Sequence, residues 1–310
     1  MKISICQSPP VYNNLEKSIE RMSQLLDQVK SNQPDCVVFG ECWLSGYPIW
    51  LDVCQRINIW DEPLTKRAWA ETYNNAIMLD SVEMRSIQQL AKTHNIWLVF
   101  GANERIESGK GSRSIYNAVF IVDPEGKIVN HHRKLVPTFT EKLVHTHGDG
   151  YGLKSVETPF GRMGALICWE HWMPMTRQIM HDSGELIHFS LWPYVKETHQ
   201  LAARHYAIEG RCYSIAVGQL FEASSLPDYL KLDEEFKSEQ WLMKGGSCAF
   251  GPDGDLILPP NYKDEFIHLE IDSSKALEEN ASLSVSGHYQ RHDVFNYSIN
   301  TSRPDKTDNA

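Results

Sequence analysis

A cysteine, a glutamate and a lysine each close a short strand-like segment of this sequence. Cys168 follows the apolar run 163–167, Glu41 follows residues 36–40, and Lys134 ends a third such segment. Apolar runs of this length are typical of buried strands, which predicts that all three side chains stand at strand ends. A thiol, a carboxylate and an ammonium group brought together can carry out nucleophilic acyl transfer.

Each of these groups has a distinct task in such a reaction. A thiol attacks carbon only as the thiolate, so Cys168 needs a base and a cationic neighbour. Glu41 can take the thiol proton and later pass it to a departing nitrogen, while Lys134 can hold the negative charge that develops. The backbone N–H of Trp169 is placed to act as an oxyanion-hole donor. Glu141, seven residues after Lys134, can reach back to position the lysine or relay protons.

Taken one at a time, these residues have ordinary explanations. A cysteine at a strand end is usually a small buried hydrophobic residue, and a Glu or Lys after a strand is usually solvated. Three ionisable residues at three buried strand ends are harder to explain by chance, which favours a catalytic site. The pairs His131-His132 and His145 with His147 are predicted to be surface or positioning residues, because no metal-ligand spacing accompanies them.

The elements that must position these groups alternate along the chain. Strand-like runs alternate with amphipathic segments such as residues 15–29, and residues 61–92 are expected to be helical. Residues 123–126 (Asp-Pro-Glu-Gly) and 251–254 (Gly-Pro-Asp-Gly) each have Pro second and Gly fourth, which predicts two β-hairpins. Two mixed α/β runs with similar hairpins predict a four-layer α-β-β-α sandwich, with helices covering both sheets.

Composition and net charge limit which partners and which cellular compartment fit this protein. The 310 residues include 30 basic and 40 acidic side chains, and the net charge of −10 argues against a nucleic-acid surface. No stretch approaches the roughly 20 apolar residues of a membrane span, and the first residues read as a strand rather than a signal peptide. The seven cysteines are scattered without a CxxC pair, which suits a reducing cytoplasm. We expect one domain over residues 1–297 and a tail over 298–310 that is flexible or a subunit contact.

Three blocks of the sequence resemble the signature segments of the nitrilase superfamily of carbon–nitrogen hydrolases. They are residues 39–48, 132–138 and 166–170. Residues 187–193 and 287–295 resemble the pocket strand and the closing motif of that family, so the resemblance covers nearly the whole chain. Within the superfamily, Cys-Trp-Glu followed by His, an aromatic residue and Met-Pro is similar to the branch of nitrilases proper.

The resemblance implies a role for each candidate residue. Cys168 is the expected nucleophile, Glu41 the general base, Lys134 the stabilising cation and Glu141 the second glutamate. The family's fold is the same α-β-β-α sandwich, its substrate a small organic nitrile, and its products the carboxylic acid and ammonia. A thioimidate and then a thioester on Cys168 are the implied intermediates. The resemblance implies no metal or organic cofactor, and a homodimer or larger homo-oligomer.

Five residues beside the catalytic blocks are candidates for shaping the substrate pocket: Tyr47, His171, Trp172, Trp192 and Pro193. Aromatic and apolar side chains line most small-molecule pockets, although core packing or subunit contact explains them equally well. His145 departs from the family pattern, since it stands where nitrilases commonly carry a large aromatic residue.

Two other function classes are compatible with these residues. An amidase of the same superfamily would use the same groups without a thioimidate, and Trp169 with the residues after it argues against that reading by resemblance. A non-catalytic thiol sensor or binding protein on this fold would not need Cys168, Glu41, Lys134 and Glu141 together. Aliphatic, aromatic and arylacetonitrile substrates, and cyanide itself, are all compatible with the motifs.

Overall fold

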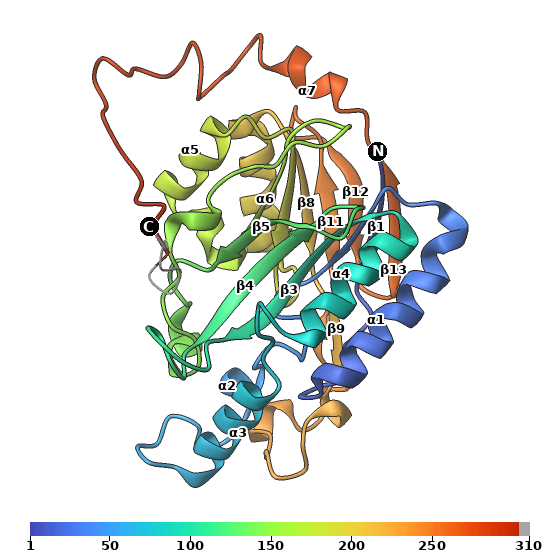
Figure 1. The fold of residues 1–310 in the computed structure, drawn as a ribbon, viewed down its shortest axis with the longest axis vertical. Helices are drawn as coiled ribbons and strands as arrows, with labels where there is room; N and C mark the ends of the chain where they lie inside the picture. The colour runs from blue at the N-terminus through green and yellow to red at the C-terminus, as the bar shows by residue number, and fades with distance from the viewer. Residues whose placement is uncertain (304–310) are drawn as a thin grey trace.

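Two β-sheets form the centre of the molecule, and the computed structural model describes residues 1–303 of the chain (Figure 1). In the first sheet the neighbouring strands are, in order, β13 (Phe266–Glu270), β1 (Lys2–Cys6), β2 (Cys36–Phe39), β3 (Trp97–Arg105), β4 (Ile115–Val122) and β5 (Ile128–Arg133). In the second they are β12 (Leu256–Asn261), β11 (Ser247–Phe250), β8 (Tyr213–Val217), β7 (Ile187–Leu191) and β6 (Met163–Ile167). A separate ribbon pairs β10 (Trp241–Lys244) with β9 (Leu220–Glu222).

The two sheets share an apolar core between their inner faces. Side chains alternate between the two faces of a strand. Ile5 and Val38 of the first sheet therefore lie in one buried cluster with Ala165 and Phe189 of the second sheet.

Helices cover the outer face of each sheet (Figure 1). α1 (Leu15–Val29) and α4 (Val82–His94) pack on the first sheet through buried residues such as Leu25 and Ile87. α5 (Pro174–Asp182) and α6 (Glu197–Gly210) lie against the second sheet, where Met180 and Tyr206 cluster with Leu166 of β6. The predicted four-layer α-β-β-α sandwich is therefore confirmed.

The segment 61–92, predicted to be helical, contains two helices with a break between them. α3 (Pro63–Asn74) ends before this break, and α4 begins after Ser81, whose side chain accepts a hydrogen bond from the first turn of that helix. Between the helices, Ile77 pairs with Glu104 at the end of β3. Pairing with a distant strand overrides the local helical preference, so the prediction of continuous helix was wrong at the break.

Both predicted hairpins form, and in each a glycine closes the turn. Gly126 donates to the Asp123 carbonyl (2.9 Å) between β4 and β5, and Gly254 donates to the Gly251 carbonyl (2.8 Å) between β11 and β12. The φ angles of Gly126 and Gly254 are +83° and +86°. Residues with a Cβ rarely adopt this conformation, which is why the turns require glycine at their fourth position.

The remaining short elements lie outside the two sheets. α2 (Trp50–Val53) and α3 project from one end of the sandwich, and α7 (Ser274–Glu279) begins the C-terminal region (Figure 1). The short 3₁₀ helices are η1 (Lys30–Asn32), η2 (Phe139–Leu143), η3 (Gly150–Gly152), η4 (Cys168–Trp172), η5 (Ala223–Ser225) and η6 (Glu234–Phe236). No helix within residues 1–303 combines the length and apolar character that crossing a membrane requires.

The C-terminal segment runs along the outside of the molecule after α7 (Figure 1). At its end, Arg303 is buried and donates to Asp149 Oδ2 (2.9 Å) and to the carbonyl oxygen of His131 (3.0 Å) on β5. The tail predicted over residues 298–310 is thus anchored at Arg303, while residues 304–310 lie outside the described part of the chain.

Candidate active site

Three strand ends meet at one place in the sandwich. β2 leads to Glu41, β5 to Lys134 and β6 to Cys168. Lys134 Nζ lies 2.9 Å from Glu41 Oε1 and 2.7 Å from Glu141 Oε2. A carboxylate oxygen of Glu41, one of Glu141 and the Sγ of Cys168 all lie within 4.8 Å of one another. The structure therefore brings together, in a buried cluster, the four residues for which catalytic roles are predicted.

Glu41 is held so that one of its carboxylate oxygens stays available. Asn117 of β4 donates to Glu41 Oε1 (2.7 Å), the oxygen that Lys134 also contacts, and Gln219 donates to the Glu41 carbonyl (2.6 Å). Glu41 Oε2 makes no hydrogen bond with any of the residues 1–303. A Cβ on Gly101 of β3 would collide with the Gly40 carbonyl, so glycine there lets the backbone of Glu41 pack against the strand. The free oxygen is the one that can accept a proton.

Glu141 is fixed by a short helix and by two side chains. It lies in the first turn of η2, where the Thr138 N–H donates to Glu141 Oε2 (3.1 Å). The hydroxyl of Tyr47 donates to Glu141 Oε1 (3.0 Å), and Lys134 contacts both oxygens. Glu141 can therefore anchor the lysine while Glu41 keeps an oxygen free.

Cys168 occupies a sharp turn directly after β6. Its φ is +52°, a conformation that costs a residue with a Cβ about 1–3 kcal/mol. The buried carboxylate of Glu170 sits under this turn and accepts hydrogen bonds from the N–H of Ile167 (2.9 Å) and the N–H of Leu135 (2.8 Å). His132 Nε2 also lies 2.9 Å from it. Glu170 thus ties the strand end that bears Cys168 to the strand end that bears Lys134.

The pKa values of the nucleophile and the base suit a proton transfer between them. Burial raises the pKa of Glu41 to about 7, against the opposing charge of Lys134. Burial, reinforced by Glu41, also raises the pKa of the Cys168 thiol, while Lys134 and the Trp169 N–H act in the opposite direction. Near neutral pH the thiol therefore keeps its proton, next to a carboxylate that can take it.

Lys134 and Glu141 remain a charged pair. Burial alone would lower the pKa of Lys134, but Cys168 in its thiolate form and the carboxylates of Glu141 and Glu41 raise it well above its usual range. Burial alone would raise the pKa of Glu141, but the ammonium of Lys134 outweighs it and the pKa of Glu141 is lowered. The lysine is thus a permanent positive charge beside the thiol.

Among residues 1–303, Glu41, Glu141 and Cys168 form one group whose ligand atoms are close enough to share a metal ion. The ammonium of Lys134 already bonds to both carboxylates. A metal cation bound by the same oxygens would face that positive charge at close range. The three ligand groups therefore do not fit a metal ion, because the Lys134 ammonium already supplies the positive charge between the two carboxylates.

A cavity of about 540 Å³ opens onto the thiol. Its walls combine apolar and polar side chains: Tyr47, Ile49, Asp52, Val53, Thr138, Phe139, Thr140, Glu141, Cys168, Trp169, Pro193, Tyr194, Lys196, Thr198, His199, Phe236 and Leu242. Of the residues predicted to shape the substrate pocket, Tyr47 and Pro193 lie in this wall. Trp172 is outside it and partly exposed.

His171 and Trp192, also predicted to shape the pocket, are buried behind its wall. The ring of Trp192 stacks on that of His199, with ring centroids 4.2 Å apart. His171 Nδ1 lies 2.7 Å from the carbonyl oxygen of Cys168, and His171 is not among the residues that line the cavity. Both residues can therefore influence the pocket only through the residues that line it.

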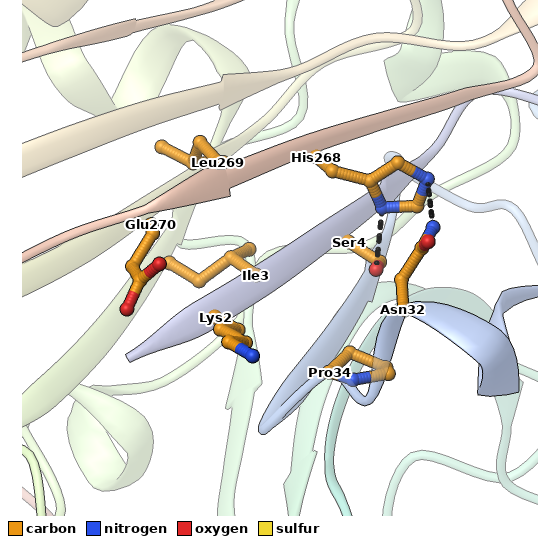
Figure 2. A pocket seen from close by; sticks show the side chains of 8 residues that line it. All are labelled: Lys2, Ile3, Ser4, Asn32, Pro34, His268, Leu269 and Glu270. Atoms are coloured by element: carbon orange, nitrogen blue, oxygen red, sulfur yellow. Dashed lines mark hydrogen bonds between the residues drawn. The ribbon is translucent and has the colours of Figure 1, made fainter.

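A second hollow lies beside β1 and β13 at the far edge of the first sheet (Figure 2). Both ring nitrogens of its histidine are engaged, with His268 Nδ1 2.9 Å from Ser4 Oγ and His268 Nε2 2.6 Å from Asn32 Nδ2. Lys2 and Glu270 line this hollow, but no cysteine is among its lining residues. The cavity at Cys168 is therefore the candidate active site.

The histidines set aside as surface or positioning residues are placed differently from one another. His131 and His132 are buried rather than at the surface, and His132 bonds to Glu170. His145 Nε2 donates to Asn103 Oδ1 (2.8 Å), and burial lowers the pKa of His145 to about 4, which keeps the ring neutral. The departure from an aromatic residue thus leaves a neutral imidazole beside Glu141.

The sequence did not predict the roles of Asn117 and Glu170 or the contacts of His171. Glu170 had one local signal, an acid within an otherwise apolar strand-to-turn segment. Asn117 had none, because its partner is 76 residues away in the chain.

Comparison with known proteins gives concordant results. The sequence model of the carbon-nitrogen hydrolase family matches residues 2–278. The chain is 30% identical to a nitrilase from Pseudomonas syringae pv. syringae (strain B728a), over 97% of this chain and 90% of that protein. It is 31% identical to an arylacetonitrilase from Aspergillus niger, over 95% of this chain and 90% of that protein.

The fold has solved counterparts as well. The crystal structure of a carbon-nitrogen hydrolase from Helicobacter pylori G27 matches with a TM-score of 0.69 at 20% identity, covering 91% of this chain and 92% of that one. The expectation drawn from the three sequence blocks is confirmed: this chain belongs to the carbon–nitrogen hydrolase family.

Proposed function

We propose that this protein is a nitrilase, which hydrolyses an organic nitrile to the carboxylic acid and ammonia. The observation that carries the proposal is the buried set of Cys168, Glu41, Lys134 and Glu141, of which Cys168 and Glu141 line a cavity. Relatives named nitrilase and arylacetonitrilase, similar over nearly the whole chain, support a nitrile as the substrate.

The first half of the reaction makes a covalent intermediate. Glu41 takes the thiol proton through its free oxygen, and the Cys168 thiolate adds to the nitrile carbon. The negative charge then moves to nitrogen, where the Lys134 ammonium and the Trp169 N–H stabilise it. Glu41 returns its proton to that nitrogen, which gives a neutral thioimidate.

The second half consumes two water molecules. Glu41 draws a proton from the first water, whose oxygen adds to the thioimidate carbon to form a tetrahedral intermediate. That proton passes to the nitrogen, which becomes an amino group. Glu41 then carries the hydroxyl proton of the intermediate to the same nitrogen, so that ammonia leaves as the C=O bond forms and a thioester remains. The second water hydrolyses the thioester in the same manner, releasing the carboxylic acid and the thiol. If the tetrahedral intermediate instead expels Cys168, the product is an amide.

Glu141 completes the proposed site and stays deprotonated throughout the reaction. Its pKa is lowered because Lys134 outweighs the effect of burial, so it stays a carboxylate while Glu41 cycles. Tyr47 and the Thr138 N–H share its remaining oxygen lone pairs. In this role Glu141 keeps the lysine charged and directed at the reacting carbon.

The test measures ammonia and carboxylic acid release from a panel of nitriles and their matching amides. We expect acid from nitriles, and loss of that activity in Cys168→Ala. Turnover of amides alone would identify an amidase, and no turnover of either would favour a thiol sensor or binding protein.

We also infer a cytoplasmic protein that forms a homodimer or larger homo-oligomer. All seven cysteines are free thiols, which suits a reducing compartment. Met175 and Leu201 are exposed apolar residues on α5 and α6 and fit a subunit contact. Light scattering from the purified protein measures the assembly directly.

A further inference from the structure

A row of buried hydrogen bonds runs from the nucleophile turn into the second sheet. His171 Nδ1 lies 2.7 Å from the Cys168 carbonyl oxygen, and His171 Nε2 lies 2.9 Å from His188 Nε2. His188 Nδ1 lies 2.9 Å from Glu185 Oε2. All three side chains are at most 3% exposed. None of them takes part in the mechanism proposed above.

The number of protons that the hydrogen bonds need defines the protonation state of the two histidines. Each of the three contacts joins two electronegative atoms and needs one proton to be attractive, so the row needs three protons. Two neutral imidazoles supply only two. The third proton makes the histidine pair a cation, which the carboxylate of Glu185 balances.

The surroundings place that charge at the far end of the row from the thiol. Although burial acts to raise it, the pKa of Glu185 is lowered to about 2 by His188 and His181. Burial and the neighbouring His188 lower the pKa of His171 well below its usual range. The two nitrogens of His188 carry the protons that its contacts with Glu185 and His171 need, because neither the Glu185 carboxylate nor His171 Nε2 supplies one, and His171 carries its own proton on Nδ1. That proton is donated to the Cys168 carbonyl.

Other groups enclose the row on the side of α5 and α6. Tyr206 donates its hydroxyl to Glu185 Oε1 and stacks on His188, with ring centroids 3.8 Å apart. His181 lies 3.7 Å from Glu185 and 3.2 Å from Glu209. Arg177 pairs with Glu209 at 2.6 Å. The carboxylate of Glu185 thus remains paired and shielded from solvent.

The geometry of one peptide bond links this row to catalysis. The Cys168 carbonyl and the Trp169 N–H belong to the same trans peptide unit, so they point in opposite directions. A carbonyl held by His171, away from the cavity, directs the N–H toward the cavity and the thiol. There the Trp169 N–H contacts the Cys168 sulfur and acts to lower its pKa. The φ of +52° at Cys168 is unfavourable for an L-residue, so the turn needs such an anchor.

We infer that His171, His188 and Glu185 form a positioning relay, which keeps the Cys168–Trp169 peptide turned so that its N–H serves as the oxyanion donor. The three side chains touch neither the substrate nor the reacting atoms. This inference rests on the proposed function, because an oxyanion donor has a task only if Cys168 attacks a carbon–nitrogen bond.

His171→Leu tests the anchor directly, because it removes the N–H that holds the Cys168 carbonyl. We expect the kcat to fall by about 10²–10³-fold, as for loss of one oxyanion donor, with little change in KM. Glu185→Gln should be tolerated, because its amide oxygen can accept from Tyr206 while its NH₂ group donates to His188 Nδ1. That NH₂ group supplies the third proton, so both imidazoles can stay neutral and His171 still donates to the Cys168 carbonyl.

His171→Asn supplies the matching rescue. The side-chain amide of Asn can place an N–H near the position of Nδ1, and that N–H needs no proton from the relay. We expect His171→Asn to keep most of the wild-type kcat and His171→Leu to lose it. Adding Glu185→Gln to His171→Asn should lower the kcat little further. Tyr206→Phe is the control, because it removes a hydrogen bond to Glu185 but leaves all three relay protons in place.

A second measurement needs no turnover. The rate of Cys168 alkylation by iodoacetamide, followed against pH with Cys168→Ala as the blank, reports the thiol pKa. We expect His171→Leu to raise that pKa, because the Trp169 N–H no longer stabilises the thiolate, and Glu185→Gln and His171→Asn to leave it near the wild-type value. If the wild type hydrolyses no nitrile or amide, the proposed function fails while alkylation still tests the relay.

The relay is overturned if His171→Leu keeps the wild-type kcat and alkylation profile, or if folded Glu185→Gln loses as much activity as His171→Leu. It is also overturned if His171→Asn and His171→Leu lose activity equally while both remain folded by circular dichroism. The His171 pair decides the question should Glu185→Gln fail to fold.

Discussion

Replacing Glu170 by Gln should destabilise the fold and disable the site together. The two oxygens of this buried carboxylate accept from the N–H of Ile167 and the N–H of Leu135, and both lie 2.9 Å from His132 Nε2. Gln presents one oxygen and one NH₂ group. At least one of the three donors must therefore face another donor.

The size of the effect follows from these contacts. A hydrogen bond to a charged acceptor contributes about 1.5–3 kcal/mol, and leaving a buried donor unsatisfied costs about 1–3 kcal/mol. The sum predicts that Glu170→Gln lowers the free energy of unfolding by about 2.5–6 kcal/mol. That is a large part of the total stability of a typical domain, which is about 5–15 kcal/mol.

Urea unfolding followed by circular dichroism measures this change. The matched control is Glu157→Gln, which removes the exposed partner of Arg162 and should change stability by at most about 1 kcal/mol. We also expect lower hydrolytic activity in folded Glu170→Gln, because Glu170 ties the strand ends of Cys168 and Lys134. A loss of stability no greater than that of the control would refute the reasoning.

Three further predictions concern the base, the lysine's anchor and a turn. Burial raises the pKa of Glu41 to about 7 and only its carboxylate form is a base, so kcat/KM should rise with pH through about 7; a profile flat from pH 5 to 9 would contradict this. Tyr47→Phe removes the hydroxyl donor to Glu141 and should lower activity by about 10-fold, the equivalent of one hydrogen bond, with unchanged folding by circular dichroism. Gly126→Ala should lower the thermal midpoint, because φ is +83° there and the new Cβ would lie 2.7 Å from the Gln88 carbonyl; a midpoint equal to that of the wild type would argue against the turn.

Much of the site was readable because its signals are local. An apolar run that ends in Cys168 or Glu41 predicts a strand with a reactive group at its end, whatever the rest of the fold does. The glycine at the fourth position of each hairpin is similarly a local requirement of the backbone. The family resemblance then extended these local signals to a fold and a set of roles.

The failures have a common physical origin in contacts between distant segments. The helix expected over residues 61–92 is interrupted where Ile77 pairs with Glu104. Asn117 reaches Glu41 across 76 residues of chain. Periodicity along a sequence carries no information on such pairs, because they form only when the sheets and loops have been assembled.

The amino-acid sequence by itself determined which chemical groups are available, that Cys168, Glu41 and Lys134 end strands, and that the strands and helices stack in four layers. Side-chain alternation and turn chemistry are properties of short segments, so these features needed no knowledge of the packed chain. Tertiary structure alone decided how the groups titrate and where they point. Burial beside Lys134 and Glu141 brings the pKa of Glu41 to about 7, and the contact between His171 and the Cys168 carbonyl orients the nucleophile turn. Both depend on desolvation and on hydrogen bonds between elements, which exist only in the folded protein.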